Sequence, residues 1–173
     1  MVPTRRLTVF DMSSESSPVL DEPPVEDHEW LLRHFPSDPS EYEFAKKFIR
    51  YSVFIPRKSD DKGLSMSREG AAFVTAERLL ATARNLNVKQ YGGVVAVLTE
   101  AIRSLNLTIE ITPGDTPGHI IIRQINRDDW DLKATDGTYP KQQAIRELAD
   151  TIVRFLKTQL QIRIHPTPRP AKK

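Results

Sequence analysis

The amino-acid sequence predicts a single α+β domain, in which a small, mostly antiparallel sheet is packed by two or three helices. The strongest indication is a long amphipathic helix over about 141–158, where apolar residues recur at helical spacing opposite charged ones. A second indication is the alternation of apolar and polar residues over 107–112, followed by a Pro-Gly turn and another apolar run over 119–125. Because helical and strand patterns are interspersed without regular βα alternation, the class is α+β.

The first half of the body carries shorter elements. An apolar-rich segment over 29–35 ends at Pro36, because a proline cannot continue a helix. Ser40 is placed to cap a helix whose apolar stripe runs from Tyr42 to Ile49. The elements expected next are a β-rich strand (51–55), a charged turn (57–63) and a short edge strand (64–66).

The second half begins with a helix that Thr75 caps. Residues 94–98 are apolar throughout, which is typical of a strand covered on both faces. Thr99 is then placed to cap one or two helical turns that stop near Asn106. After the hairpin, residues 126–140 are polar and indicate a loop leading into the last helix.

Charge divides the chain into three parts. Residues 1–29 hold seven acidic and two basic residues, whereas the rest of the chain holds 23 basic and 16 acidic residues. Residues 11–27 are also rich in Ser and Pro, and such a segment buries too little apolar surface to offset its ordering entropy. We therefore expect a disordered acidic arm over 1–27, a single domain over 28–160 and a basic, Pro-rich tail over 161–173.

The composition excludes several classes of protein. The chain has 173 residues and no cysteine, so disulfides, a thiol nucleophile and a cysteine zinc site are excluded. No apolar run approaches the roughly 18–20 residues of a membrane span. The short apolar patch after Arg5 and Arg6 is interrupted by Asp11, unlike that of a signal peptide. A cytoplasmic protein without membrane contact is expected.

Several short stretches together resemble a group of small bacterial proteins of unknown function. That group has an LLRR-P opening, an LS strand, a T-x-E helix start, a G-V-x strand and a P-x-H turn. The resembling residues here are Trp30–Pro36, Gly63–Met66, Thr75–Glu77, Gly92–Val97, Leu105–Leu107 and Thr116–Ile120. The resemblance covers roughly 29–125, and Gly118 and Ile120 replace the small residues usual around the histidine of the turn. It implies a bacterial single-domain protein and nothing about catalysis.

His119 is the leading candidate for a catalytic residue. It follows a rigid Pro-Gly loop at the start of a strand, and an imidazole is suited to proton transfer. A hydrolase would need Ser65 or Ser67 as nucleophile and a carboxylate such as Glu110 to orient the imidazole. The Gly-x-Ser-x-Gly elbow is missing. The alternative is a structural histidine that hydrogen-bonds the hairpin loop.

Metal and cofactor sites lack their sequence patterns. His28 and His34 lie six residues apart, whereas two ligands on one helix face need a spacing of three or four. The acidic residues between Asp128 and Asp136 lack the glycine and glutamate positions of a calcium loop. We expect no metal and no cofactor.

Contact with a partner is indicated by charge and by one tryptophan. Arg57, Lys58 and Lys62 cluster on one turn and could face an acidic protein or, with the basic tail, nucleic-acid phosphates. Trp130 lies in the polar segment, where it could be a contact hot spot or could fold back onto the core.

The leading hypothesis is a non-enzymatic protein-interaction module or accessory subunit of a bacterial process, because no catalytic constellation is complete. The alternatives are a His119-dependent hydrolase and a nucleic-acid-binding accessory protein.

Overall fold

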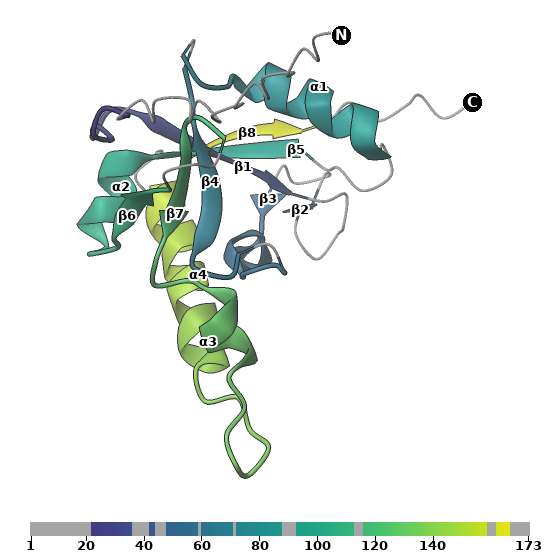
Figure 1. Ribbon diagram of the computed structural model, residues 1–173, viewed down its shortest axis with the longest axis vertical. Coiled ribbons are helices and arrows are strands. Elements are labelled where there is room, and N and C mark those ends of the chain that lie inside the picture. The colour runs from purple at the N-terminus through teal and green to yellow at the C-terminus, as the bar shows by residue number, and fades with distance from the viewer. Residues whose placement is uncertain are drawn as a thin grey trace, which may run out of the picture.

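The structure is a computed structural model that describes residues 22–35, 42–43, 48–58, 60–70, 72–87, 93–112, 116–158 and 162–166 (Figure 1). Its strands are β1 (Trp30–Phe35), β2 (Tyr42–Glu43), β3 (Phe48–Ile49), β4 (Leu64–Arg68), β5 (Gly93–Leu98), β6 (Ile109–Ile111), β7 (His119–Ile122) and β8 (Ile162–Pro166). Its helices are the 3-10 helix η1 (Tyr51–Phe54), α1 (Ala76–Asn87), α2 (Thr99–Ser104), α3 (Arg127–Asp131) and α4 (Gln142–Thr158). None of these helices has the length and apolar character needed to cross a membrane.

Six strands form one sheet in the order β6–β7–β4–β1–β5–β8, and each neighbouring pair is antiparallel. In Figure 1, β4 and β7 cross the direction of β5 and β8 at a large angle, which reflects the twist of the sheet. The predicted α+β single domain with an antiparallel sheet and a long C-terminal helix is therefore confirmed.

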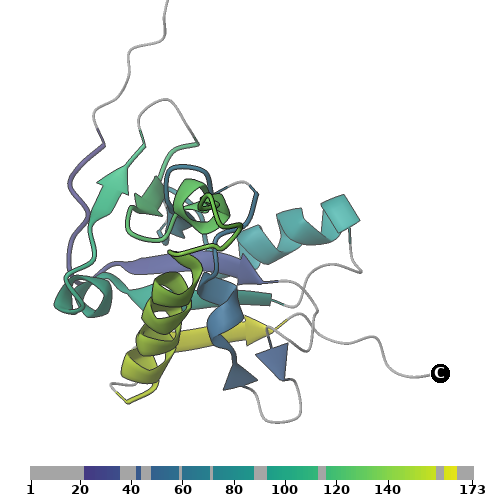
Figure 2. The same cartoon turned by 90° about the horizontal axis from the view of Figure 1, so that it is seen from below.

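The inner face of the sheet is the face covered by α4, η1 and α2 (Figure 2). The amphipathic pattern of α4 places one apolar stripe against the sheet, and its residues Ile145, Ala149, Ile152, Val153 and Leu156 are all buried. The strands contribute Leu31, Phe35, Leu64, Met66, Val95, Val97, Ile120 and Ile122 to the same cluster. Because burying one large aliphatic side chain contributes about 1.5–3 kcal/mol, this layer is the main source of stability.

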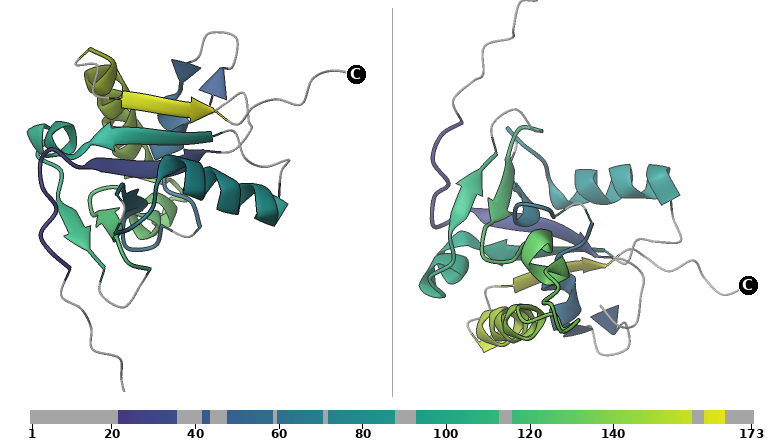
Figure 3. Two further views of the ribbon diagram at one scale, coloured as in Figure 1. Left: turned by 90° about the horizontal axis from the view of Figure 1, so that it is seen from above. Right: turned by 60° about the horizontal axis from the view of Figure 1, so that its bottom comes forward.

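The opposite, outer face is covered in part by α1. Figure 3 shows α1 and α4 on opposite sides of β1 and β5. Leu79 and Leu80 of α1 pack with a small cluster that contains Leu32 of β1 together with Val94 and Ala96 of β5. The predicted coverage of β5 on both faces is thus confirmed, since its side chains pack on α4 on one side and on α1 on the other.

Residues 42–55 differ from the prediction. The expected helix is instead a short hairpin in which Tyr42 pairs with Ile49, and both side chains are buried. The expected strand over 51–55 is the helix η1, which buries Val53 and Phe54 in the core. Tertiary burial overrides local propensity at both places. The predicted cap Ser40 lies outside the described residues.

The second half agrees better with its predictions. Thr75 accepts a hydrogen bond from the Arg78 amide at 3.2 Å and precedes α1 as expected. The hairpin of β6 and β7 is confirmed. The predicted cap at Thr99 is wrong, because Thr99 is the first residue of α2 and Leu98 holds the cap position. Residues 64–66 belong to a strand as predicted, but the predicted position at an edge of the sheet is wrong, because β4 lies between β1 and β7.

Both ends of the folded body extend beyond their predicted boundaries. Residues 22–29, here called the N-terminal strap, lie against the body and bury Val25, although residues up to 27 were assigned to a disordered arm. Residues 162–166 form β8 alongside β5, although they were assigned to a tail. At both ends, residues whose composition predicts an arm or a tail instead pack against the body. The rest of the predicted arm and tail lies outside the described residues.

Candidate functional site on the outer face of the sheet

The strand register brings polar side chains together on the outer face. Side chains alternate between the two faces of a strand, and Leu64 and Met66 of β4 lie in the inner core, so Ser65 and Ser67 face outward. Ser67 pairs with His119 of β7, and register partners share a face. The outer face of β4 and β7 therefore carries the hydroxyl groups of Ser65 and Ser67 and the imidazole of His119.

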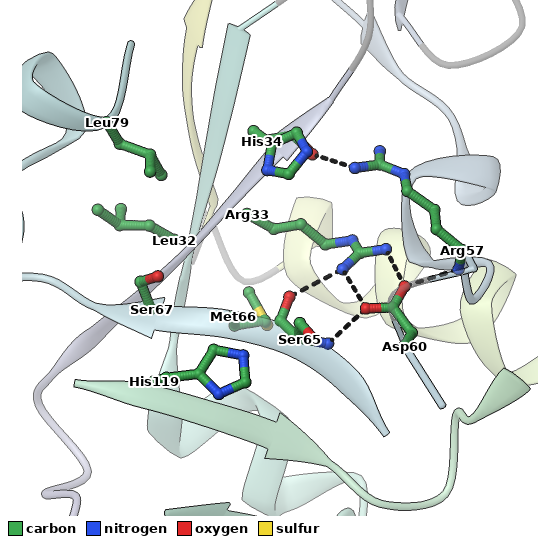
Figure 4. Close-up of a pocket in the computed structure, with 10 residues that line it drawn as sticks. All are labelled: Leu32, Arg33, His34, Arg57, Asp60, Ser65, Met66, Ser67, Leu79 and His119. Carbon is green, nitrogen blue, oxygen red and sulfur yellow. Dashed lines mark hydrogen bonds and ion pairs between the residues drawn. The ribbon is translucent and has the colours of Figure 1, made fainter. Parts of the chain in front are cut away.

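A pocket of about 160 Å³ lies at this place (Figure 4). Strands β1, β4 and β7, the 57–60 turn and α1 all contribute to its lining. The residues that line it are Leu32, Arg33, His34, Arg57, Asp60, Ser65, Met66, Ser67, Leu79 and His119.

One wall of the pocket is a buried ion pair. Arg33 and Asp60 are 3% and 1% exposed, and the Arg33 guanidinium lies 2.8 Å from an Asp60 oxygen. The guanidinium also donates to the carbonyl oxygens of Val53 and Ser65, each at 2.8 Å. Asp60 accepts the backbone N–H groups of Arg57 and Ser65 at 2.6 and 2.9 Å. The pair is hydrogen-bonded on both sides and fastens the turn to the sheet.

The charge state of this pair follows from its surroundings. Burial acts to raise the pKa of Asp60, but the hydrogen bonds and the charge of Arg33, with two backbone N–H groups, outweigh burial and lower that pKa. Asp60 is therefore ionised, and its negative charge offsets that of Arg33.

Arg57 and His34 also line the pocket. The Arg57 guanidinium donates to the His34 carbonyl oxygen at 2.9 Å, which links the turn to β1 (Figure 4). His34 is exposed toward the pocket, while the protein atoms around its ring desolvate it. That desolvation, followed by repulsion from Arg57 and Arg33, lowers the pKa of His34 to about 4. The imidazole is therefore neutral near pH 7.

His119 is positioned by the turn before it and by the neighbouring strand. Gly118 has a φ of 78°, and a Cβ at this position would lie 2.7 Å from the Phe73 ring, so only glycine fits. The Nδ1 atom of His119 lies 2.5 Å from the Thr112 hydroxyl, at the end of β6. This hydrogen bond joins the two strands of the hairpin.

The three residues named for a hydrolase are brought near one another but not into a triad. His119 and Ser65 line the same pocket. Glu110 lies in an adjoining depression and forms an ion pair with Arg123 at 2.8 Å. Thr112, not Glu110, is the hydrogen-bond partner found at His119 Nδ1.

A second, more open depression of about 670 Å³ adjoins the pocket. Two contacts place the depressions side by side. Ile121 lines the second depression and is the register partner of Ser65, which lines the pocket. Thr112 also lines the second depression, and its hydroxyl forms the hydrogen bond with His119 of the pocket. The second depression is lined by Asp61, Lys62, Glu110, Ile111, Thr112, Ile121, Arg123, Asn126, Asp128 and Asp129. The two depressions together are here called the outer groove.

The predicted partner-binding residues divide into two groups. Arg57 lines the pocket, Lys62 lines the second depression, and Lys58 is exposed on the same turn. Trp130 is half-buried against the core, and the Arg146 guanidinium stacks 5.3 Å from its ring centroid. For Trp130 the structure therefore agrees with the alternative in which the ring folds back onto the core.

The sequence patterns miss two site residues. His34 is considered only as a metal ligand and Thr112 only as a polar position in a strand, whereas Ser67 is named beside Ser65 as a candidate nucleophile. The alternation of Ser65 and Ser67 with apolar neighbours was the available signal for an outward-facing pair. Their partners depend on strand register, which the sequence does not display.

Within the described ranges, no three histidine, aspartate or glutamate side chains are grouped so that they could hold a metal ion. Comparisons with protein-family models, with curated proteins and with solved structures find no match to this chain. The proposals that follow therefore rest on the geometry of the outer groove.

Proposed function

We propose that the protein is an interaction module that binds an extended segment of another protein in the outer groove. The observation that carries the proposal is the uneven cover of the outer face: α1 packs on β1 and β5, whereas the surface of β4, β7 and β6 is hollowed into two adjoining depressions. Strands lie about 4.8 Å apart, so the groove from β1 to β6 is about 14 Å long. About four residues of extended chain span that length.

The charges along the groove favour a segment with a basic residue at one end. At the β1 end the charges of Arg33 and Asp60 offset each other. At the α3 end the exposed carboxylates of Asp61 and Asp128 border the second depression. A segment with a basic residue at this second end complements the surface.

A peptide-display experiment tests this proposal. A random dodecapeptide library is selected on the full chain, and the enriched peptides are synthesised and titrated. We expect peptides that bind the natural chain and lose at least about tenfold in affinity on Ser67→Trp, because the indole fills the pocket. Lys62→Glu, an exposed substitution in the second depression, should alter the charge preference of the bound peptides without unfolding the domain.

The matched control is Thr151→Trp on the exposed side of α4, on the other side of the sheet. Enriched peptides should bind Thr151→Trp as tightly as the natural chain. Equal affinities for Ser67→Trp and Thr151→Trp, or a selection that enriches no peptide, would refute binding in the groove.

Hydrolysis at His119 is a second candidate function, favoured by one observation. His119 and Ser67 are register partners on adjacent strands and line one pocket, with Nδ1 of His119 held by Thr112. This candidate predicts hydrolysis of a p-nitrophenyl ester above the buffer rate that is lost in both His119→Ala and Ser67→Ala. Activity that survives either substitution would exclude it.

A further inference from the structure

We propose that β6 binds an extended segment of another protein, which joins the sheet as a further antiparallel strand. The contact is made at the backbone groups of Ile109 and Ile111 that point away from β7, here called the open edge. The bound segment carries an apolar, a basic and an apolar residue in succession. This contact is separate from binding in the outer groove and stands independently of the proposed function.

The hydrogen bonds between β6 and β7 show which backbone groups of β6 face its neighbour. β6 is the last strand at one end of the sheet, so β7 lies along one of its two edges. In an antiparallel pair, alternate residues hydrogen-bond the neighbour and the residues between them do not. The Arg123 amide donates to the Thr108 carbonyl oxygen at 3.2 Å, and the Thr112 amide donates to that of His119 at 3.3 Å. The even-numbered residues of β6 therefore bond β7.

The odd-numbered residues Ile109 and Ile111 consequently point their N–H and C=O groups to the open edge. The other side of β7 agrees with this assignment: the Arg68 amide donates to the Gly118 carbonyl oxygen at 2.8 Å, so even-numbered residues of β7 bond β4 and odd-numbered ones bond β6. Within the described part of the chain, no hydrogen bond reaches the outward groups of Ile109 and Ile111. Two donors and two acceptors in a row are a template for another strand.

The inner face of β6 favours apolar residues in the bound segment. Ile109 and Ile111 pack against the inner core but are only partly buried. Residues directly opposite each other on adjacent strands share a face, so the residues that bond Ile109 and Ile111 also lie beside their side chains. Apolar side chains at these two positions would extend the inner layer by one strand.

The outer face of β6 favours a basic residue between the two apolar ones. Glu110 faces outward with its register partner Ile121, and it lines the second depression. Four carboxylates and two cations line that depression: Asp61, Glu110, Asp128, Asp129, Lys62 and Arg123. Lys141 offsets Asp129 from outside, and the net charge remains negative. Because opposite charges on adjacent strands attract, a lysine or arginine fits opposite Glu110.

The same charge disfavours a second copy of this chain as the occupant. A two-fold arrangement that uses all four outward groups pairs Ile109 of one copy with Ile111 of the other. This register sets Glu110 directly opposite Glu110 of the other copy, and like charges in that position are destabilising. A segment of another protein with a basic middle residue avoids this repulsion.

Hydrogen exchange of the full chain tests the open edge. The amides of Ile109 and Ile111 should exchange fast, whereas the amide of Glu110 between them bonds β7 and should exchange slowly. Equal protection of the three amides would overturn the assignment of the open edge.

Binding is measured by titrating the nitrogen-15-labelled chain with the synthetic peptide acetyl-Thr-Ile-Lys-Ile-Thr-amide. We expect saturable shifts of the Ile109 and Ile111 amide signals and slower exchange of both amides. An N-methyl group on the second isoleucine of the peptide removes a donor to β6 and should weaken binding at least about tenfold. The matched control has its N-methyl group on the lysine, whose amide points away from β6, and should bind as the parent peptide does.

A charge exchange tests the middle position. A peptide with glutamate in place of lysine should bind several-fold more weakly, and Glu110→Lys in the chain should reverse this preference. Glu147→Lys, at an exposed position of α4, makes the same change of charge away from β6 and should leave the preference unchanged. Thermal melting of both variants confirms that they are folded.

Equal affinities of the two N-methylated peptides would overturn the proposal, as would the absence of shifts at Ile109 and Ile111. Shifts of these signals with protein concentration alone would assign the open edge to a second copy and overturn its assignment to another protein. Shifts confined to Ser65 and Ser67 would place the peptide in the outer groove, which supports the proposed function and refutes binding at β6.

Discussion

Arg33 and Asp60 contribute to the fold only as a pair. Each is almost fully buried, and their charges compensate each other across the 2.8 Å between a guanidinium nitrogen of Arg33 and a carboxylate oxygen of Asp60. Removing one charge leaves the other buried without compensation, which typically costs about 3–5 kcal/mol. We expect Asp60→Asn to lower the free energy of unfolding by that amount, measured by urea denaturation followed by circular dichroism.

The exposed ion pair of Asp150 and Arg154 on α4 supplies the control for this prediction. Its side chains are 43% and 73% exposed, and such i,i+4 pairs contribute about 0.3–0.5 kcal/mol. Asp150→Asn should therefore leave the urea midpoint nearly unchanged. A comparable small effect of Asp60→Asn would mean that Asp60 is not held as a buried charge.

His34 makes stability depend on pH in a defined window. Desolvation by the surrounding protein, with repulsion from Arg57 and Arg33, lowers the pKa of His34 from 6.5 to about 4 on folding. Between these values the unfolded chain binds more protons than the folded chain, so the free energy of unfolding falls as the pH decreases. Urea midpoints measured from pH 7 to pH 4.5 should show this decline. His34→Gln should flatten the profile, and Arg57→Gln should flatten it in part; an unchanged slope in His34→Gln would contradict the assignment.

The site residues show how far single positions can be inferred from sequence. His119 and Ser65 were identifiable because a histidine after a Pro-Gly turn and a serine between apolar residues stand out locally. His34 joins them only because β1 pairs with β4 on one side and with β5 on the other. Register between strands far apart in sequence is set by tertiary packing, so local patterns do not reveal it.

Elements were predictable where their apolar period was long. The pattern of α4 extends over more than four turns and leaves no alternative, whereas the apolar residues from Tyr42 to Ile49 fit a helix and a hairpin equally well. The hairpin prevails because it buries Tyr42 and Ile49 together, with the Tyr42 ring 5.1 Å from that of Phe35. Long-range contacts decide such short segments.

Strand β8 was missed because its residues are basic and adjoin prolines. It covers the edge of β5, pairing Ile164 with Val95, and Arg163 stacks on the Trp30 ring at 3.5 Å.

An uncovered apolar strand edge is a template for aggregation. A chain shortened after residue 161 should therefore melt at a lower temperature and scatter light on heating. A chain shortened after residue 166 retains β8 and serves as control; identical behaviour of the two would show that β8 does not protect the sheet.

The N-terminal strap connects two distant parts of the molecule. Arg68, at the end of β4, binds Glu29 at 2.6 Å and donates to the carbonyl oxygen of Pro23 at 2.7 Å. Arg103 of α2 donates to the carbonyl oxygen of Val25 at 2.6 Å, and the Val25 side chain lies in the core. The strap thus ties β4 to α2 across the sheet, so we infer that it unfolds together with the body.

Val25→Asp tests this cooperativity, because it places a carboxylate where an apolar side chain is buried. Loss of apolar burial and the cost of an unpaired charge should together lower the free energy of unfolding by at least about 2 kcal/mol. Glu26→Ala, at the adjacent exposed position, should have almost no effect.

Hydrogen exchange distinguishes the two ways in which the strap can behave. In a cooperative molecule, Val25→Asp accelerates exchange in β4 and α2 as well as in the strap. Faster exchange confined to residues 22–29, with an unchanged urea midpoint, would show that the strap opens independently of the sheet.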